Sequence, residues 1–402
     1  MISPATRERL FFKNFILGLS IGGALGEWVV VCWIVGHPPL VLHAVVPVLL
    51  AVVNRQAARR LEREPAAGIF AGPLGHVVLA CAFGAMMCTG VLGVVAGAWA
   101  FCAFIGALSA EARVVIGTGT DPVFGPAFRI VGSGALALVA GAMAYGYVRG
   151  HRRLMVTRLP LPFPDLPPAL AGLRIVHVSD LHLGPLADRD GIRGAIDEVL
   201  ALDPDVVCVT GDIVDSPAAD LDTWIPELAR LTARRGVFAI LGNHDRHIGA
   251  DDVARALRER TSWRVLRDDI ATIDVDGARV NVIGFEDRPH HCATDGLAPL
   301  LARAPRGEPS ILLAHRPCVF PMAAAAGVHL MLAGHTHGGQ LAVPGAPRLN
   351  VARAVMGRFD AGAFTLGGST LYVSRGLGVS GQPLRIGVPR EIAALTLVDA
   401  AS

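Results

Sequence analysis

The sequence is poor in charged residues, in paired cysteines and in basic patches, and each shortage narrows the class of protein. Only 17% of its 402 residues are charged and 52% are apolar, a more apolar balance than soluble proteins usually have. The net charge of +2, without basic patches interleaved with aromatic residues, gives no reason to expect a nucleic-acid partner. No two of the seven cysteines form a CxxC pair, so we expect neither a disulfide framework nor a zinc ribbon. The absence of a phosphate-binding P-loop argues against kinase chemistry.

Apolar residues concentrate in the first 148 residues, which contain four long runs. These runs cover residues 15–35, 40–53, 69–108 and 130–148. A helix needs about 20 apolar residues to cross the hydrocarbon core of a bilayer. The second run is short for one span and the third is too long for one, so the third is either a helix with an interfacial piece or a hairpin of two helices. The pattern predicts an N-terminal domain of about four transmembrane α-helices, with five as the alternative.

Basic residues indicate how these helices are oriented. Clusters at 7–13, 55–63 and 149–158 flank the runs, and four spans place all of them on one side, as the positive-inside rule expects. We therefore expect a multi-pass protein of the cell inner (plasma) membrane, in contact with its lipids, with both termini and the C-terminal domain in the cytoplasm. Glu27, in the middle of the first run, indicates either a buried interhelical hydrogen bond or a role in handling lipid or substrate.

Residues 149–172 separate two domains. This segment is basic and then rich in proline, so it cannot continue a helix and is expected to form a semi-rigid extended linker. The chain therefore divides into a transmembrane anchor at 1–148, this linker, and a domain at 173–398. In the last of these, apolar β-branched runs alternate with helical stretches at 189–202 and 218–235, which predicts an α/β fold: a layered β-sandwich flanked by helices.

Polar residues suited to metal binding follow the apolar runs of the C-terminal domain. The segments are Asp180-Leu-His182, Gly211-Asp212-Ile-Val-Asp215, Gly242-Asn243-His244-Asp245, Glu286-Asp287, His315 and Gly334-His335-Thr-His337. Nearly all come directly after a strand-like run, so the side chains are carried on loops just beyond buried strands. Two neighbouring divalent ions need about seven or eight such oxygen and imidazole ligands, with one carboxylate shared. The pattern predicts a two-metal hydrolytic centre.

The order of these motifs, DxH, GDxxD, GNHD, a single His and GHxH, resembles the calcineurin-like metallophosphoesterase superfamily. The segments 334–340 and 372–378 are similar to a membrane-associated bacterial branch, which includes phosphodiesterase-like enzymes and a pyrophosphohydrolase of UDP-2,3-diacylglucosamine. The resemblance covers roughly residues 173–396. It departs at Pro389-Arg390-Glu391, where the branch often has Arg-Pro-Glu.

The resemblance implies the metal ligands and the cofactors. The first ion would be held by Asp180, His182, Asp212 and His337, and the second by Asp212, Asn243, His315 and His335. Asp212 would bridge the two divalent ions, which mixed nitrogen and oxygen ligands allow to be Mn, Fe, Zn or Co. This set of ligands has no position left for His244. We therefore expect His244 to act on the substrate, either as proton donor to the leaving oxygen or as stabiliser of developing charge.

The remaining polar residues near the motifs each have a functional and a structural interpretation. Asp245 either orients His244 or caps the loop, and Asp215 either braces the first metal site or caps a helix. Substrate contacts are predicted for Arg375 and Arg385, as a phosphate clamp, with surface ion pairing as the alternative. Glu286, Asp287, His290 and His291 are predicted either to approach the substrate or to be turn and loop residues.

We therefore expect a membrane-anchored, metal-dependent phosphoric ester hydrolase with a phosphorylated substrate. It would cleave a phosphodiester or pyrophosphate bond, with a lipid-linked molecule as the expected substrate, by in-line attack of a metal-bridging hydroxide. One alternative is a phosphomonoesterase or phosphoprotein phosphatase that uses the spans only as an anchor. The other is a non-enzymatic membrane sensor or transporter, in which metal ligands would be missing; none is missing here.

Overall fold

This computed structural model describes separate helical stretches of the first 125 residues and most of the chain thereafter. The described residues are 21, 23–32, 41–42, 45–52, 87–98, 126–163, 166–184, 187–215, 218–288, 292, 294–380 and 383–399. The chain divides into two compact units, one comprising residues 146–402 and the other residues 6–145, apart from a few residues at the N-terminus.

The N-terminal unit is helical where the structure describes it. Its longer helices include Gly23–Cys32, Met87–Ala98 and α5 (Pro126–Val148). Among the described residues, one helix, Arg129–Arg152, is long and apolar enough to cross a membrane. It coincides with the predicted run at 130–148. The other predicted runs lie partly outside the described residues, so the four-span topology stays a prediction.

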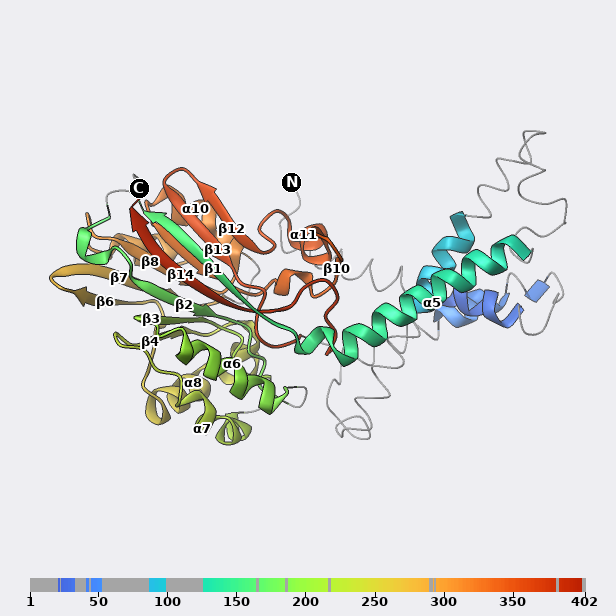
Figure 1. The fold of residues 1–402 in the computed structure, drawn as a ribbon, viewed down its shortest axis with the longest axis horizontal. Coiled ribbons are helices and arrows are strands. Elements are labelled where there is room, and N and C mark those ends of the chain that lie inside the picture. The colour runs from blue at the N-terminus through green and yellow to red at the C-terminus, as the bar shows by residue number, and fades with distance from the viewer. Residues whose placement is uncertain are drawn as a thin grey trace. The chain divides into compact units, whose positions relative to one another are not determined.

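The C-terminal unit is built on two six-stranded mixed sheets (Figure 1). The strand order of the first is β1 (Leu154–Phe163), β14 (Arg390–Asp399), β2 (Arg174–Val178), β3 (Val206–Thr210), β4 (Val237–Ile240) and β5 (Trp263–Val265). That of the second is β12 (Gly362–Leu366), β13 (Ser369–Val373), β9 (Leu330–Ala333), β8 (Ser310–Ala314), β7 (Ala278–Phe285) and β6 (Asp269–Val275). Strands β2 to β5 are parallel, and so are β7, β8, β9 and β13, so the C-terminal ends of each set lie at one edge of its sheet.

Helices cover the outer face of each sheet, which gives a layered α/β/β/α arrangement (Figure 1). The first sheet packs against α6 (Arg189–Ala201), α7 (Ile225–Leu228) and α8 (Asn243–Arg260), and the second against α9 (Leu297–Ala302) and α10 (Phe320–Ala325). In β3, Val207 and Val209 face the helices, whereas Val206 and Cys208 face the other sheet. Because both faces of the central strands are covered, their sequences are continuous apolar runs rather than alternating ones.

Shorter elements complete the unit. A two-stranded hairpin is formed by β10 (Ala342–Val343) and β11 (Ala346–Asn350) and is followed by α11 (Val351–Met356). The 3₁₀ helices are η2 (Gly150–Arg152), η3 (Pro168–Leu170), η4 (Ala218–Thr223), η5 (Pro317–Val319) and η6 (His337–Gly339).

Strand β1 occupies much of the segment at 149–172, which was predicted to be a semi-rigid extended linker. It pairs in parallel with β14 from Leu154, opposite Arg390, to Phe163, opposite Asp399. Leu161 and Phe163 are buried between the sheets. Pro160 and Pro162 are tolerated because β1 is an edge strand, where one side needs no N–H donors. The extended backbone is present as expected, but it belongs to the sheet.

The helix predicted at 218–235 is present only in pieces, as η4 and α7, and residues 229–235 are turns and loop. Pro226 has no N–H and occupies the first turn of α7, where a helix can tolerate it. The chain then enters β4 through Gly236, whose φ of 110° is incompatible with a continuing helix. The helix predicted at 189–202 corresponds to α6.

Candidate metal centre

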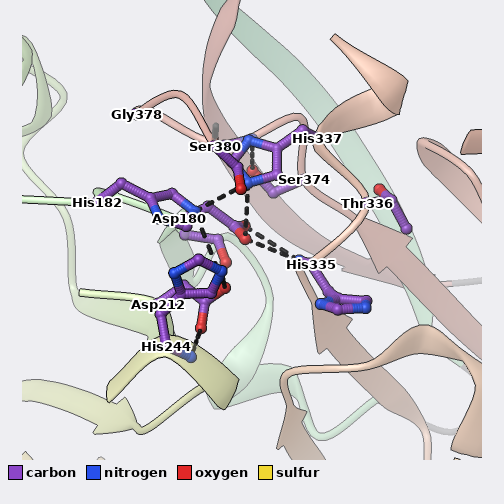
Figure 2. A network of polar contacts seen from close by, with 12 residues as sticks. Asp180, His182, Asp212, His244, His335, Thr336, His337, Ser374, Gly378 and Ser380 are labelled. Atoms are coloured by element: carbon purple, nitrogen blue, oxygen red, sulfur yellow. Dashed lines mark hydrogen bonds and ion pairs between the residues drawn. The ribbon is translucent and has the colours of Figure 1, made fainter. Parts of the chain in front are cut away.

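Side chains from both sheets meet at the C-terminal ends of the parallel strands (Figure 2). They lie in the loops after β2, β3, β8 and β9 and at the start of α8 after β4, and they are Asp180, His182, Asp212, Asn243, His244, His315, His335 and His337. Their ligand atoms form three groups, in each of which all atoms lie within 4.8 Å of one another: Asp180 with His182 and His337, His182 with Asp212 and His244, and Asp212 with His315 and His335. Asp212 is shared by two of these groups.

Donor atoms of the centre converge at short range. Nε2 of His182 lies 2.9 Å from Nε2 of His337 and 3.8 Å from Oδ2 of Asp212. Nε2 of His315 lies 3.2 Å both from Oδ2 of Asp212 and from Oδ1 of Asn243. These side chains are buried, and burying carboxylates without a cation is costly. The donor set therefore fits divalent metal ions.

Backbone strain is concentrated at the same residues. Asp180, His182, Asp212, His335 and His337 all have φ between 46° and 70°, in the left-handed region. Residues with a side chain adopt this region rarely, at a cost of roughly 1–3 kcal/mol each, and such strain clusters at functional sites. The loops are therefore held in shapes that their own residues do not favour.

Two positions next to the centre require glycine because neighbouring atoms leave no room for a side chain. A Cβ at Gly242 would lie 2.2 Å from Oδ1 of Asp212, and a Cβ at Gly334 would lie 2.2 Å from Oδ2 of Asp180. Both distances are far below van der Waals contact. Any side chain at these positions would therefore displace a carboxylate of the centre.

His244 contacts Asp215, whereas Asp245 follows the second of its two predicted roles, that of a cap. Oδ1 of Asp215 lies 2.8 Å from Nδ1 of His244 and 2.8 Å from Nδ1 of His182. The carboxylate of Asp245 instead accepts hydrogen bonds from the backbone N–H groups of Ile213, Val214 and Gly242. Asp245 occupies the first turn of α8, where its side chain points back to cap the helix.

The charges around Asp215 set the protonation of His244. Burial disfavours a charged carboxylate, but hydrogen bonds with His182 and His244 outweigh it and lower the pKa of Asp215 to about 2. Burial likewise disfavours a charged ring, yet the hydrogen bond with Asp215 and the charges of Asp212 and Asp215 raise the pKa of His244 to about 9. These contacts therefore favour the protonated form of the His244 ring.

The contacts of Arg385 and Arg375 favour structural roles over the predicted phosphate clamp. Arg385 is 1% exposed, and its guanidinium donates to the carbonyl oxygens of Arg375, Gly376, Gly378 and Pro389. Its Nη2 also lies 3.3 Å from Nδ1 of His337. Arg375 forms an ion pair with buried Glu391. Both guanidinium groups brace the loop after β13 behind the centre.

Glu286 and Asp287, the remaining acidic pair, also contact arginines. Glu286 accepts from Arg267, and Asp287 accepts from Nε of Arg316 at 2.8 Å. Arg316 was not predicted from the sequence, and neither was Arg246, which lies 3.6 Å from Asp287. Their adjacency to His315 and Asp245 in the chain was the one signal that could have indicated them. His290 and His291 lie outside the described residues.

A disulfide joins Cys292 to Cys318, a single bond that the sequence analysis, which expected no disulfide framework, did not indicate. The two residues are 26 positions apart, and neither belongs to a CxxC pair. The bond ties the loop after β7 to η5, which follows His315. Pairing of cysteines so far apart depends on the tertiary fold, so local spacing gave no indication of it.

A two-sheet α/β sandwich that gathers carboxylates and imidazoles around one shared aspartate defines the metallophosphoesterase class of proteins. The family model for calcineurin-like phosphoesterases matches residues 173–339. An uncharacterized metallophosphoesterase of Bacillus subtilis, YkuE, is 31% identical over 279 residues, covering 65% of this chain and 93% of that protein. The chain belongs to the calcineurin-like metallophosphoesterase family.

Relatives also include longer proteins. A bovine (Bos taurus) "transmembrane protein with metallophosphoesterase domain" is 34% identical over 260 residues, which cover 60% of this chain and 56% of the relative. A zebrafish (Danio rerio) protein of the same name is 31% identical over 293 residues, covering 66% of this chain and 62% of the relative. The chain thus spans only about three fifths of the length of these relatives.

Proposed function

We propose that this protein is a membrane-anchored hydrolase that cleaves phosphodiester or pyrophosphate bonds at a centre of two divalent metal ions. The observation that carries the proposal is the sharing of Asp212 between two groups of possible ligands, one with His182 and His244 and the other with His315 and His335. A carboxylate between two sets of imidazoles suits a pair of cations because it offsets their mutual repulsion. Membership of the metallophosphoesterase family supports the same chemistry.

Seven side chains would hold the ions: Asp180, His182, Asp212 and His337 the first, and Asp212, Asn243, His315 and His335 the second. When bound, the ions would supply water activated at neutral pH and would offset the charge on the phosphoryl oxygens. The chain prepares its imidazoles for this task. Nδ1 of His315 lies 2.8 Å from the carbonyl oxygen of Thr210, and Nδ1 of His182 contacts Asp215, which leaves Nε2 of both rings directed at Asp212.

His244 is suited to act on the substrate. Its side chain is 36% exposed, whereas the surrounding imidazoles of His182 and His315 are almost wholly buried, so a substrate can reach it. The pKa of its ring is raised by the contact with Asp215, which holds the ring and favours its protonated form. We assign it the donation of a proton to the leaving oxygen, with Asp215 as the residue that orients the ring.

A short connection would keep the catalytic domain at the membrane. Only residues 149–153 separate the end of α5 from the start of β1. Five residues span at most roughly 18 Å, so an anchor formed by α5 would hold the domain close to the headgroups. The names of the vertebrate relatives support a membrane location. A lipid-linked phosphate or pyrophosphate is therefore a reasonable substrate class, because the tether raises the local concentration of enzyme at the bilayer.

Two observations bear on the side of the membrane, and they point in opposite directions. The basic clusters favour a cytoplasmic domain, whereas the Cys292–Cys318 disulfide is typical of oxidising compartments. Alkylation of these thiols in intact cells and after lysis separates the two. If the two cysteines are reduced and are alkylated only after lysis, the domain lies on the cytoplasmic side. If they are alkylated only after a reducing agent is added, they form a disulfide and the domain lies on the outer side.

The proposed activity is tested with the full chain in detergent, loaded with Mn. We expect turnover of bis(p-nitrophenyl) phosphate, and loss of that turnover together with loss of bound metal in Asp212→Asn. Activity on p-nitrophenyl phosphate alone would show a monoesterase instead. A protein that binds metal but turns over neither ester would refute the proposed function.

A further inference from the structure

Two arginines converge on one buried carboxylate at the border of the metal centre. Asp287 follows β7, Arg316 follows His315 after β8, and Arg246 lies in the first turns of α8. Nε of Arg316 donates to Oδ1 of Asp287 at 2.8 Å, and Nη2 of Arg246 lies 3.6 Å from Oδ2 of the same carboxylate. The side chain of Asp287 is only 4% exposed, whereas those of Arg316 and Arg246 are 14% and 24% exposed.

This cluster has unfulfilled hydrogen-bonding capacity. Oδ2 of Asp287 and Nε of Arg246 are both buried and, among the described residues, have no hydrogen-bond partner. Buried polar atoms are nearly always paired, and an unpaired one requires an explanation. Two guanidinium groups against one carboxylate also leave a net positive charge. Oδ2 of Asp287 faces the Arg246 guanidinium at 3.6 Å, whereas the unpaired Nε of Arg246 and the excess of positive charge suit an additional ligand that is anionic and rich in oxygen.

The cluster is close enough to the centre to share a substrate with it. Nη1 of Arg316 lies 3.1 Å from Nε2 of His335, which belongs to the group around Asp212. A small cavity of about 10 Å³ is lined by Asp287, His315 and Arg316, among others. Planar guanidinium groups bind phosphate oxygens through paired hydrogen bonds.

We propose that Arg316 and Arg246, positioned by Asp287, form an anion subsite that binds the second, non-reacting phosphoryl group of a pyrophosphate substrate. This inference rests on the proposed function, because it assumes that the first phosphoryl group is cleaved at the metal centre. It makes the arginines selectivity residues, which distinguish a pyrophosphate diester from a simple phosphodiester. A purely structural ion pair would affect both substrates alike.

Selectivity is measured with two substrates of the Mn-loaded full chain in detergent. ADP-ribose carries a pyrophosphate bridge, and bis(p-nitrophenyl) phosphate carries a single phosphoryl group. In Arg316→Gln and in Arg246→Gln, kcat/KM for both substrates is compared with that of wild type. The fall for ADP-ribose should be about 10- to 100-fold larger than the fall for bis(p-nitrophenyl) phosphate, because one charge-assisted hydrogen bond typically contributes that much. Arg255→Gln, at an exposed position of the same helix α8, is the matched control and should leave the ratio unchanged.

Binding provides a readout that does not depend on turnover. Methylenediphosphonate, which cannot be hydrolysed, is titrated calorimetrically into metal-free protein, so that only protein groups contribute. We expect binding to wild type and to Arg255→Gln, and at least tenfold weaker binding to the two cluster variants. If Arg316→Gln does not fold, Arg316→Lys, which keeps the charge but not the planar fork, should still lower the ADP-ribose preference.

Three outcomes overturn the inference. They are an unchanged substrate ratio in both arginine variants, equal methylenediphosphonate affinity in variants and wild type, and a wild type that cleaves bis(p-nitrophenyl) phosphate but not ADP-ribose. A wild type that cleaves neither substrate with any metal refutes the proposed function instead. The calorimetric comparison then still decides whether the arginines bind a diphosphate.

Discussion

Replacing Gly334 by alanine should inactivate the centre without removing a single ligand. The added Cβ would lie 1.9 Å from Oγ of Ser179 and 2.2 Å from Oδ2 of Asp180, whereas ordinary contact begins at 3.4 Å. Either the Asp180 carboxylate or the strand end that carries His335 has to move by more than roughly 1 Å. A displacement of that size at a catalytic centre can cost about 100-fold in rate. We therefore expect kcat/KM for bis(p-nitrophenyl) phosphate to fall at least about 100-fold.

Gly194→Ala is the matched control for this substitution. Gly194 lies in α6, no neighbouring atom lies within 4 Å of the place that an added methyl group would take, and alanine favours a helix interior by roughly 0.5–1 kcal/mol. Activity, bound metal and thermal unfolding are measured for both variants. Gly334→Ala should lose metal and activity while it still unfolds cooperatively. Gly194→Ala should match wild type in activity and bound metal and should unfold at the same or a slightly higher temperature. Activity of Gly334→Ala within threefold of wild type would show that the close approach of this loop to Asp180 does not position the carboxylate.

Three further predictions concern the residues that support the centre. Asp215→Asn should lower kcat about 10- to 100-fold in steady-state assays, because it weakens the contacts that orient both His182 and His244. An unchanged kcat would show that Asp215 does not orient these rings for catalysis. Chelation should lower the unfolding temperature, and Mn at 100 times its Kd should restore about 2.7 kcal/mol, observed as a shift of several degrees in scanning calorimetry. Asp212→Asn should abolish that shift, and a shift of the same size in the variant would contradict the assignment of Asp212. Arg385→Gln should cost roughly 2–4 kcal/mol in urea unfolding, because it leaves buried carbonyl oxygens behind His337 without donors, and a loss below about 0.5 kcal/mol would refute the bracing role.

The positions of the candidate ligands were predictable because each follows a strand whose apolar run is unmistakable. Runs such as 206–210 and 310–314 are buried on both faces, so the first polar residue after them marks the end of the strand. Parallel strands then bring those ends to one edge of the sheet. Local patterns of this kind need no knowledge of distant contacts.

Roles that depend on side-chain direction could not be predicted in the same way. Asp245 is the neighbour of His244 in the chain, but the start of α8 turns its carboxylate towards the backbone, and Asp215 reaches the ring from another loop. The place of Asp245 three residues after Gly242 already allowed a capping interpretation. For Arg385, only the tertiary fold reveals that its guanidinium is enclosed by carbonyl oxygens.

The pairing of β1 with β14 has a mechanical consequence. In the chain, β1 comes after α5 and η2. Strands β1 and β14 are paired in parallel without a change of register from Leu154 to Phe163. A pull on the chain at Leu154 along the strand would load the whole ladder of backbone hydrogen bonds in shear instead of peeling them open one at a time. The edge strand is therefore suited to bear tension applied at Leu154 without peeling away from β14.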